Sequence, residues 1–286
     1  MTQIGQILIH VAGVGLRSAS HCHVHHNRIA GSPRYGLQAD SFFKGEGGGV
    51  PDNSRFNLFE FNIITDTCRT TSDCGAVEMI GSGQPGDDGP APGWYSANTL
   101  RYNNISNIVG SSSSDGKTVC VHGEPAGPTC RGLVWGVYLD GGQAGITIES
   151  NIIDATLHGA VFDNAGGNNT QTNNIFVAGP GSPVLMDFGA PGTSASTPRS
   201  IAGNVMQRNI FYWYSSSGER QIAGGAATAT AAVAARSIYG SQVHWTADFL
   251  KPNGSDYNLF FSPSEDAAAA SVFPLAVNLS VWQGQK

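Results

Sequence analysis

A short motif, asparagine followed by apolar residues, recurs along the chain and constrains its fold more than any other feature. The repeating asparagines are Asn27, Asn62, Asn104, Asn151, Asn174, Asn209 and Asn258. The shortest interval, 23 residues from Asn151 to Asn174, contains one strand-like segment that begins with glycine, Gly159 to Asp163. The longer intervals contain Gly-, Pro- and Ser-rich stretches, as insertions into a constant repeat do. The pattern therefore predicts a solenoid of stacked coils.

The period and the short apolar segments predict an all-β fold, a right-handed parallel β-helix of about eight coils. In such a fold each strand stacks on its equivalent in the next coil, and asparagine side chains can form a ladder at the turns. Leucine-rich repeats have a comparable period, but the Leu-x-x-Leu-x-Leu pattern that they require is absent. A β-sandwich with evenly spaced strands is the remaining structural alternative. We expect the long loop insertions to lie on one face of the solenoid.

The whole chain, residues 1–286, is expected to form one β-helix domain. The repeat region covers about residues 5–262, an Ala-rich insert covers 222–235, and residues from about 263 to 286 form a C-terminal cap or tail. The first residues lack the basic start and the cleavage site of a secretory signal. Strand-like sequence begins at once, so we expect a fragment of a longer protein. Its uncapped first coil would pair with the missing N-terminal part or support self-assembly.

Charge and cysteine content limit the partners and the compartment. The net charge is −6, and no cluster of Lys and Arg provides the basic surface that nucleic acid requires. No apolar run approaches the roughly 18 residues of a membrane span. Of five cysteines, Cys120 and Cys130 share one Gly/Pro/Ser-rich insert, where we expect a disulfide. Four Asn-x-Ser/Thr sequons, at Asn104, Asn168, Asn253 and Asn278, are compatible with a secreted glycoprotein. We expect an extracellular or cell-surface location.

A column of carboxylates is the main chemical feature of the repeat. Aligned on glycine, the segments GLQAD, GAVEM, GVYLD and GAVFD end at Asp40, Met79, Asp140 and Asp163, and PVLMD follows in the next coil. Alternate residues of a strand share one face, so this alignment makes Asp140 and Asp163 outward neighbours on adjacent coils. Three interpretations remain open: acid/base catalysis, a calcium site, and aspartates that cap turns.

Several segments of the chain resemble carbohydrate-active proteins with a right-handed parallel β-helix fold. The resemblance is to glycoside hydrolases of this fold, including α-L-fucosidase and β-xylosidase members, over roughly residues 10–215 and 255–262. Its most specific part is Thr71 to Ala76, similar to a T-x-D-x-G-A signature, followed one coil later by Gly136 to Asp140. The resemblance implies Asp73 and Asp140 as the catalytic pair, with Glu78 and Asp163 as the next candidates.

Other side chains near the carboxylate column are candidates for substrate binding. They are Arg34, Asp40, Trp94, Tyr138 and His158. Aromatic rings can stack on sugars, and a histidine beside carboxylates can bind substrate or transfer protons. His21, His23 and His25 would share one strand face, but in-line histidines fit a surface stripe better than a tetrahedral site. We therefore expect no metal site there and no cofactor, with calcium at the carboxylates as the exception left open.

These features favour a protein that hydrolyses glycosidic bonds of a polysaccharide with two carboxylates. A polysaccharide lyase or epimerase acting on a uronate polymer is the alternative among enzymes, although the basic residues it needs are sparse. A structural or adhesive extracellular β-helix that forms part of a larger assembly is the non-catalytic alternative.

Overall fold

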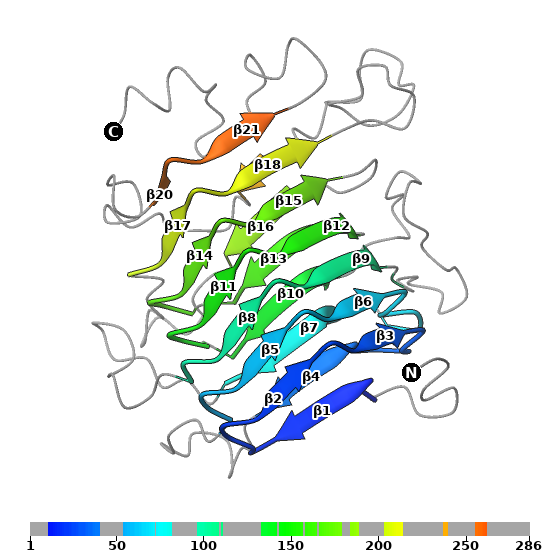
Figure 1. Cartoon of the computed structure of the whole chain (residues 1–286). Helices are drawn as coiled ribbons and strands as arrows, with labels where there is room; N and C mark the ends of the chain where they lie inside the picture. Colours follow the sequence, from blue (N-terminus) through cyan, green and yellow to red (C-terminus); the bar gives the residue numbers. More distant parts are fainter. Residues whose placement is uncertain are drawn as a thin grey trace, which may run out of the picture.

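The chain folds into three parallel β-sheets, seen in a computed structural model (Figure 1). The structure describes residues 11–40, 54–71, 73–81, 96–108, 110, 133–141, 143–156, 158–164, 166–178, 184–188, 203–213, 237–239 and 255–261. No described residue is helical, so none of the described chain forms a helix that could cross a membrane. The predicted Ala-rich insert, the C-terminal cap or tail and the pair Cys120 and Cys130 lie outside these residues.

Within the described residues each sheet contains seven strands, one from each coil, where about eight coils were predicted. Sheet A is formed by β1 (Val14–Arg17), β4 (Leu37–Asp40), β7 (Asp73–Ile80), β10 (Leu133–Asp140), β13 (Gly159–Asp163), β16 (Val184–Phe188) and β19 (Ser237–Tyr239). Sheet B is formed by β2 (His23–His25), β5 (Leu58–Glu60), β8 (Thr99–Arg101), β11 (Thr147–Glu149), β14 (Thr170–Thr172), β17 (Val205–Gln207) and β20 (Ser255–Asp256). Sheet C is formed by β3 (Arg28–Ala30), β6 (Ile63–Thr65), β9 (Asn104–Ile108), β12 (Ile152–Thr156), β15 (Ile175–Ala178), β18 (Ile210–Trp213) and β21 (Leu259–Phe261). The chain visits A, B and C in turn and then begins the next coil, which confirms the parallel β-helix predicted from the repeat.

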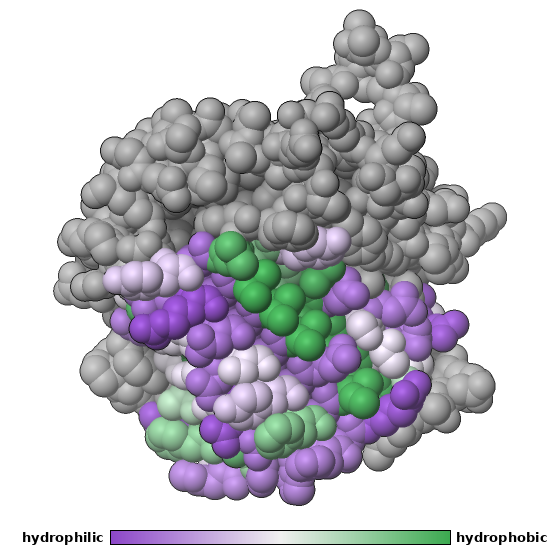
Figure 2. Space-filling view, turned by 45° about the horizontal axis from the view of Figure 1, so that its top comes forward, coloured by the Kyte–Doolittle hydropathy of each residue, from purple (hydrophilic) through white to green (hydrophobic). Residues whose placement is uncertain are grey.

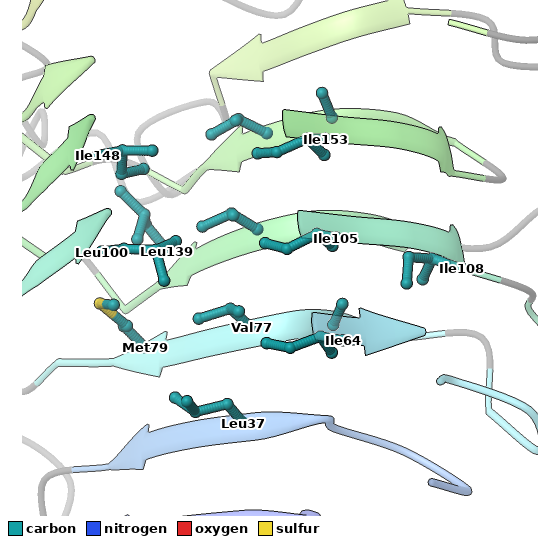
Figure 3. Close-up of a cluster of buried hydrophobic side chains, with 14 of the residues drawn as sticks. Leu37, Ile64, Val77, Met79, Leu100, Ile105, Ile108, Leu139, Ile148 and Ile153 are labelled. Carbon is teal, nitrogen blue, oxygen red and sulfur yellow. The ribbon is translucent and has the colours of Figure 1, made fainter. Parts of the chain in front are cut away.

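Apolar side chains from all three sheets fill the inside of the coil. Val77, Val137 and Val161 form one buried column of sheet A. Ile64, Ile105 and Ile153 form the equivalent column of sheet C, and Figure 3 shows the side chains of both sheets pointing toward one another. Burying one such side chain contributes about 1.5–3 kcal/mol, so stacked equivalent residues give every coil its share of one continuous core.

A ladder of asparagines, buried in the five middle coils, joins the coils at the corner between sheets B and C. Its members are Asn27, Asn62, Asn103, Asn151, Asn174, Asn209 and Asn258. The backbone N–H of each donates to Oδ1 of the next, at 2.9–3.1 Å. Each side-chain amide from Asn62 onward also donates to a sheet B carbonyl of the preceding coil. The ladder predicted for the turns is thus present, and it satisfies backbone groups that a two-residue corner leaves without sheet partners.

The ladder member in the third coil is Asn103, and the prediction of Asn104 was wrong by one residue. Asn103 is buried and accepts from Asn62, whereas Asn104 is exposed and is the first residue of β9. The motif requires an inward apolar residue two positions after the asparagine. In this coil that residue is Ile105, which pairs with Ile64.

A second ladder, not predicted from the sequence, lies at the corner between sheets A and B. It contains Asn57, Asn98, Asn169 and Asn204. Asn57 N–H donates to Asn98, and Asn169 N–H donates to Asn204. Ile146 takes the intervening position and donates its N–H to Asn169. This break, and the unequal spacing of the asparagines, hide the ladder in the sequence.

Differences in connection length between coils are concentrated next to sheet A. Every connection from sheet B to sheet C is two residues long, such as Phe61 and Asn62. In contrast, 17 residues separate Asp40 from Leu58, and 24 separate Ile108 from Leu133. The long insertions therefore occur in the connections that lead from sheet C to sheet A and from sheet A to sheet B. Their own structure lies outside the described residues.

The outer faces of the sheets differ in character. Sheet C exposes apolar side chains, including Ile63, Ile152 and Leu259, which are 43%, 43% and 58% exposed. Figure 2 shows a band of hydrophobic surface between hydrophilic side chains. Outward side chains of sheet A such as Glu78 and Tyr138 are instead buried, at 2% and 5% exposure. The outer face of sheet A is thus buried at Glu78 and Tyr138, whereas Asp73 at the start of β7 is 58% exposed.

A disulfide joins Cys68 and Cys74 across the connection from sheet C to sheet A in the second coil. Both cysteines are buried, and the bond ties the connection after β6 to the start of β7, the strand that carries Glu78. Disulfides persist in oxidising compartments, so this bond is weakly consistent with the expected extracellular location.

We expect Asn103→Ala to lower the free energy of unfolding by about 1–3 kcal/mol, because it removes buried hydrogen bonds to two neighbouring coils. Asn104→Ala, the matched control one residue along, should change it by less than about 0.5 kcal/mol because the side chain is exposed. Urea denaturation of both variants measures the difference. Equal destabilisation would contradict the ladder register.

Candidate functional site

The predicted site residues Asp73, Glu78, Tyr138 and Asp140 lie on two neighbouring strands of sheet A, β7 and β10. Glu78 pairs with Tyr138, and Asp140 pairs with Ile80, two residues along. Glu78 alternates with the buried Val77 and Met79, and Tyr138 and Asp140 alternate with buried Val137 and Leu139. All three side chains therefore point out of the coil on the same face of sheet A.

Arg34 and Tyr35 join this group from the connection that precedes β4. Arg34 Nη2 lies 3.6 Å from Asp73 Oδ2, and its guanidinium stands 4.7 Å above the Tyr35 ring centroid. Tyr35 is buried and shares a hydrogen bond with Glu78. Arg34 was predicted as a substrate-binding candidate, but the contact between Tyr35 and Glu78 depends on the stacking of two coils and was not predicted.

Glu78 is a buried carboxyl group whose pKa is raised to about 8, chiefly because burial disfavours its charged form. The positive charge of Arg34 opposes this rise, and the negative charge of Asp140 adds to it. Gly75 N–H donates to Oε2 at 3.3 Å. At neutral pH this carboxyl group mostly retains its proton, which is the state that a general acid requires.

Asp140 has a different environment on the same face. Its Oδ1 accepts hydrogen bonds from Gly141 N–H and from Asn164 Nδ2, each at 2.7 Å. Within the described part of the chain nothing donates to Oδ2. Two donors therefore fix the orientation of this carboxyl group through Oδ1. The role of Asn164 was missed, because it follows β13 directly and faces Asp140 only through the coil stacking.

Asp163 does not belong to this face, and the predicted alignment of Asp163 with Asp140 was wrong. Asp163 pairs with Leu139, on the inward side, and is fully buried. Gly159 pairs with Trp135 rather than with Gly136, and a slip of one residue moves a side chain to the opposite face of a strand.

The Asp163 carboxyl group caps a turn and supports the second asparagine ladder. Its Oδ1 accepts from Gly166 N–H at 2.8 Å. Its Oδ2 accepts from Asn169 Nδ2 at 2.9 Å and from Asn204 Nδ2 at 3.2 Å. Burial raises its pKa to about 7 although these three donors favour the charged form. The turn-capping interpretation applies to this aspartate.

Asp40 lies on the outer face of sheet A but is engaged by another group. It pairs with Ile80 in the next coil, and Arg17 Nη2 lies 3.2 Å from Asp40 Oδ2. Burial raises the pKa of Asp40 and the charge of Arg17 opposes the rise. Ile80 separates Asp40 from Asp140, so Asp40 borders the group without touching it.

An aromatic cluster continues the outer face toward the following coil. Trp135 stacks on Phe162 at 5.0 Å between ring centroids, and Tyr138 contacts Phe162 at 4.9 Å. The His158 ring packs against Trp135 with 4.5 Å between ring centroids, so this predicted residue lies beside sheet A, which carries the carboxylates. Trp94 lies outside the described residues.

No described group of three or more His, Cys, Asp or Glu side chains is arranged to hold a metal ion. The calcium interpretation of the carboxylates thus gains no support from the described residues.

Comparison of the chain with models of protein families, with curated proteins and with solved structures finds no match. The resemblance to β-helix glycoside hydrolases therefore stays a prediction in its functional part, and the site must be judged from its own geometry.

We expect Asp163→Asn to lower the free energy of unfolding by about 1–3 kcal/mol at neutral pH, because an amide nitrogen replaces one of the two oxygens and faces either Gly166 N–H or the side-chain amides of Asn169 and Asn204, all of which are donors. Asp140→Asn keeps an Oδ1 acceptor for Gly141 and Asn164 and should cost less than about 1 kcal/mol. Thermal and urea denaturation compare the two. A larger loss in Asp140→Asn would contradict the assignment of Asp163 as the structural aspartate.

Glu78 should make the protein less stable as the pH rises. Its folded pKa of about 8 lies above the ordinary value of 4.5. Between these values the folded state binds more protons than the unfolded state, so the free energy of unfolding falls with increasing pH. Glu78→Gln cannot ionise and should show a shallower decline between about pH 5 and pH 9. Denaturation at several pH values measures both slopes, and identical slopes would refute the buried acid.

Proposed function

We propose that this protein hydrolyses glycosidic bonds, with Glu78 as general acid and Asp140 as general base. The observation that carries the proposal is a pair of outward-facing carboxyl groups on adjacent strands with contrasting environments. Glu78 is buried beside Tyr35 and keeps its proton near pH 7, whereas Asp140 is held through Oδ1 by Gly141 and Asn164. An acid that protonates the leaving oxygen and a base that activates water are the two groups that this reaction needs.

The register gives an approximate separation for the pair. Glu78 and Asp140 stand one strand apart and two residues apart along the strand direction. A strand spacing of about 4.8 Å and a rise of about 3.3 Å per residue place their Cβ atoms about 8 Å apart. Carboxyl groups separated by about 6.5–9.5 Å leave room for a water molecule and are typical of inverting enzymes. The proposal therefore includes inversion at the anomeric carbon.

Asp73 takes a binding role in this proposal rather than the acid role expected from the resemblance. Its side chain is 58% exposed and forms an ion pair with Arg34. Exposure and a cationic partner both favour a charged carboxylate, which can accept hydrogen bonds from sugar hydroxyl groups. The similarity of Thr71 to Ala76 to a signature of β-helix glycoside hydrolases agrees with a substrate contact at this position.

The charge of the site favours a neutral glycan over a uronate polymer. Among the described residues of this face, the carboxyl groups of Glu78, Asp140, Asp73 and Asp40 outnumber the guanidinium groups of Arg34 and Arg17, which are paired with Asp73 and Asp40. A lyase or epimerase needs positive charge to offset the carboxylate of its substrate. The excess of acidic groups on this face is unfavourable for such a substrate. A location outside the cytosol, where glycans are abundant, agrees with the Cys68–Cys74 disulfide.

The test is hydrolysis of a panel of aryl glycosides and neutral and acidic polysaccharides by the full chain, Glu78→Gln and Asp140→Asn. We expect new reducing ends from a neutral substrate and a loss of about 10²–10⁴-fold in kcat for each variant. Glu149→Gln, which changes a carboxylate on the outer face of sheet B, serves as the matched control and should retain activity.

Three other outcomes would overturn the proposal. Products with the ultraviolet absorbance of an unsaturated uronate would assign a lyase. Full activity in both carboxyl variants would place the reaction elsewhere. Absence of any product from a folded sample would favour the structural or adhesive alternative.

A further inference from the structure

We propose that His25 and His26 form a two-imidazole binding site for Cu²⁺ or Ni²⁺ at the corner between sheets B and C of the first coil. The site is independent of the proposed hydrolase function, because sheet B lies on another side of the solenoid from the Glu78 and Asp140 face.

The proposal rests on the distance between two ring nitrogens. His25 Nδ1 and His26 Nδ1 lie 2.9 Å apart. Imidazole nitrogens bind these metals at about 2.0–2.1 Å, and two such bonds at a right angle place the nitrogens about 2.9 Å apart. A tetrahedral angle would require about 3.3 Å. The spacing thus matches square-planar or tetragonal coordination, which is the preference of Cu²⁺ and Ni²⁺ rather than Zn²⁺.

Neighbouring side chains hold both rings in this arrangement. The His26 ring stacks on Phe61 at 5.0 Å. The His25 ring packs on His23 at 4.1 Å, and His23 is itself held by a 2.8 Å contact between its Nε2 and Glu60 Oε1. The backbone is fixed as well, because Asn27 Nδ2 donates to the His25 carbonyl as part of the asparagine ladder. The metal would meet a preformed pair, which reduces the entropy cost of binding.

The pair is also open to a metal ion from solvent. Both histidines are exposed, and the contact between their Nδ1 atoms needs a proton on only one of them. A shift of that ring to the Nε2–H tautomer leaves a lone pair on each Nδ1 without net loss of a proton, and a bound metal ion would then replace the hydrogen bond between the two nitrogens. Because no third protein donor of a metal site gathers here among the described residues, water completes the coordination. The donors are therefore the consecutive residues His25 and His26, and of the three in-line histidines of the sequence pattern His25 alone belongs to the proposed site.

The test titrates the full chain with Cu²⁺, Ni²⁺ and Zn²⁺ by calorimetry and records the electron paramagnetic resonance spectrum of the Cu²⁺ complex. We expect one site, stronger for Cu²⁺ than for Zn²⁺, with hyperfine coupling to two imidazole nitrogens. His25→Ala and His26→Ala should each weaken Cu²⁺ binding about a hundredfold, since a chelate becomes a single contact.

His21→Ala provides the matched control. His21 also adopts a positive φ at a corner, and it stacks on Phe56 at 5.2 Å as His26 stacks on Phe61. The His21→Ala variant should bind Cu²⁺ like the unaltered chain, although it loses a stacking contact comparable to the one that His26→Ala loses. Equal weakening in all three variants, a spectrum with one nitrogen, or unchanged binding in the double variant His25→Ala/His26→Ala would each overturn the site. Circular dichroism verifies that every variant remains folded.

Discussion

The hydrogen bonds of the asparagine ladder set the geometry on which the rest of the molecule depends. At each corner between sheets B and C, a residue with positive φ, such as Phe61 or Tyr102, is followed by an asparagine whose amide links adjacent coils. The corner spans two residues in all seven coils, so each strand of sheet C begins in the same place above the last. This fixed corner brings Ile64, Ile105 and Ile153 into one buried column. The ladder thus keeps the coils in regular register, and the apolar core stabilises the resulting stack.

The fold could be predicted from the sequence because its repeating unit is local. An asparagine followed two residues later by an inward apolar residue describes one corner completely, and the uninterrupted 23-residue interval gives the length of a whole coil. The error at Asn104 shows that such a pattern can place a ladder residue one position away from its true place. Asn104 directly precedes the apolar Ile105, but the two-residue spacing to this inward residue is met by Asn103, because Ser106 follows Asn104 at that distance.

The candidate site was harder to predict, since it depends on register across coils. Glu78, Asp140 and Asp73 were recognised as individual carboxylates, but their relations follow from which residues pair between β7 and β10. Gly75 and Gly159 both stand opposite Trp135, whereas the sequence aligned them with Gly136. That slip placed Asp163 on the wrong face. The buried environment of Glu78 depends on Tyr35, which is 43 residues earlier and arrives through the preceding coil.

The uneven distribution of connection lengths divides the solenoid into an invariant part and a variable part. Insertions are confined to the connections that enter and leave the strands of sheet A, while the corner between sheets B and C keeps its two residues. Loop length beside the Glu78 and Asp140 face can thus change without altering the ladder, because a longer surface loop costs only a small additional closure entropy. For protein engineering, the connections beside sheet A are the natural positions for grafted segments. Recognition can be redesigned there, one loop at a time, on a backbone whose pitch stays constant.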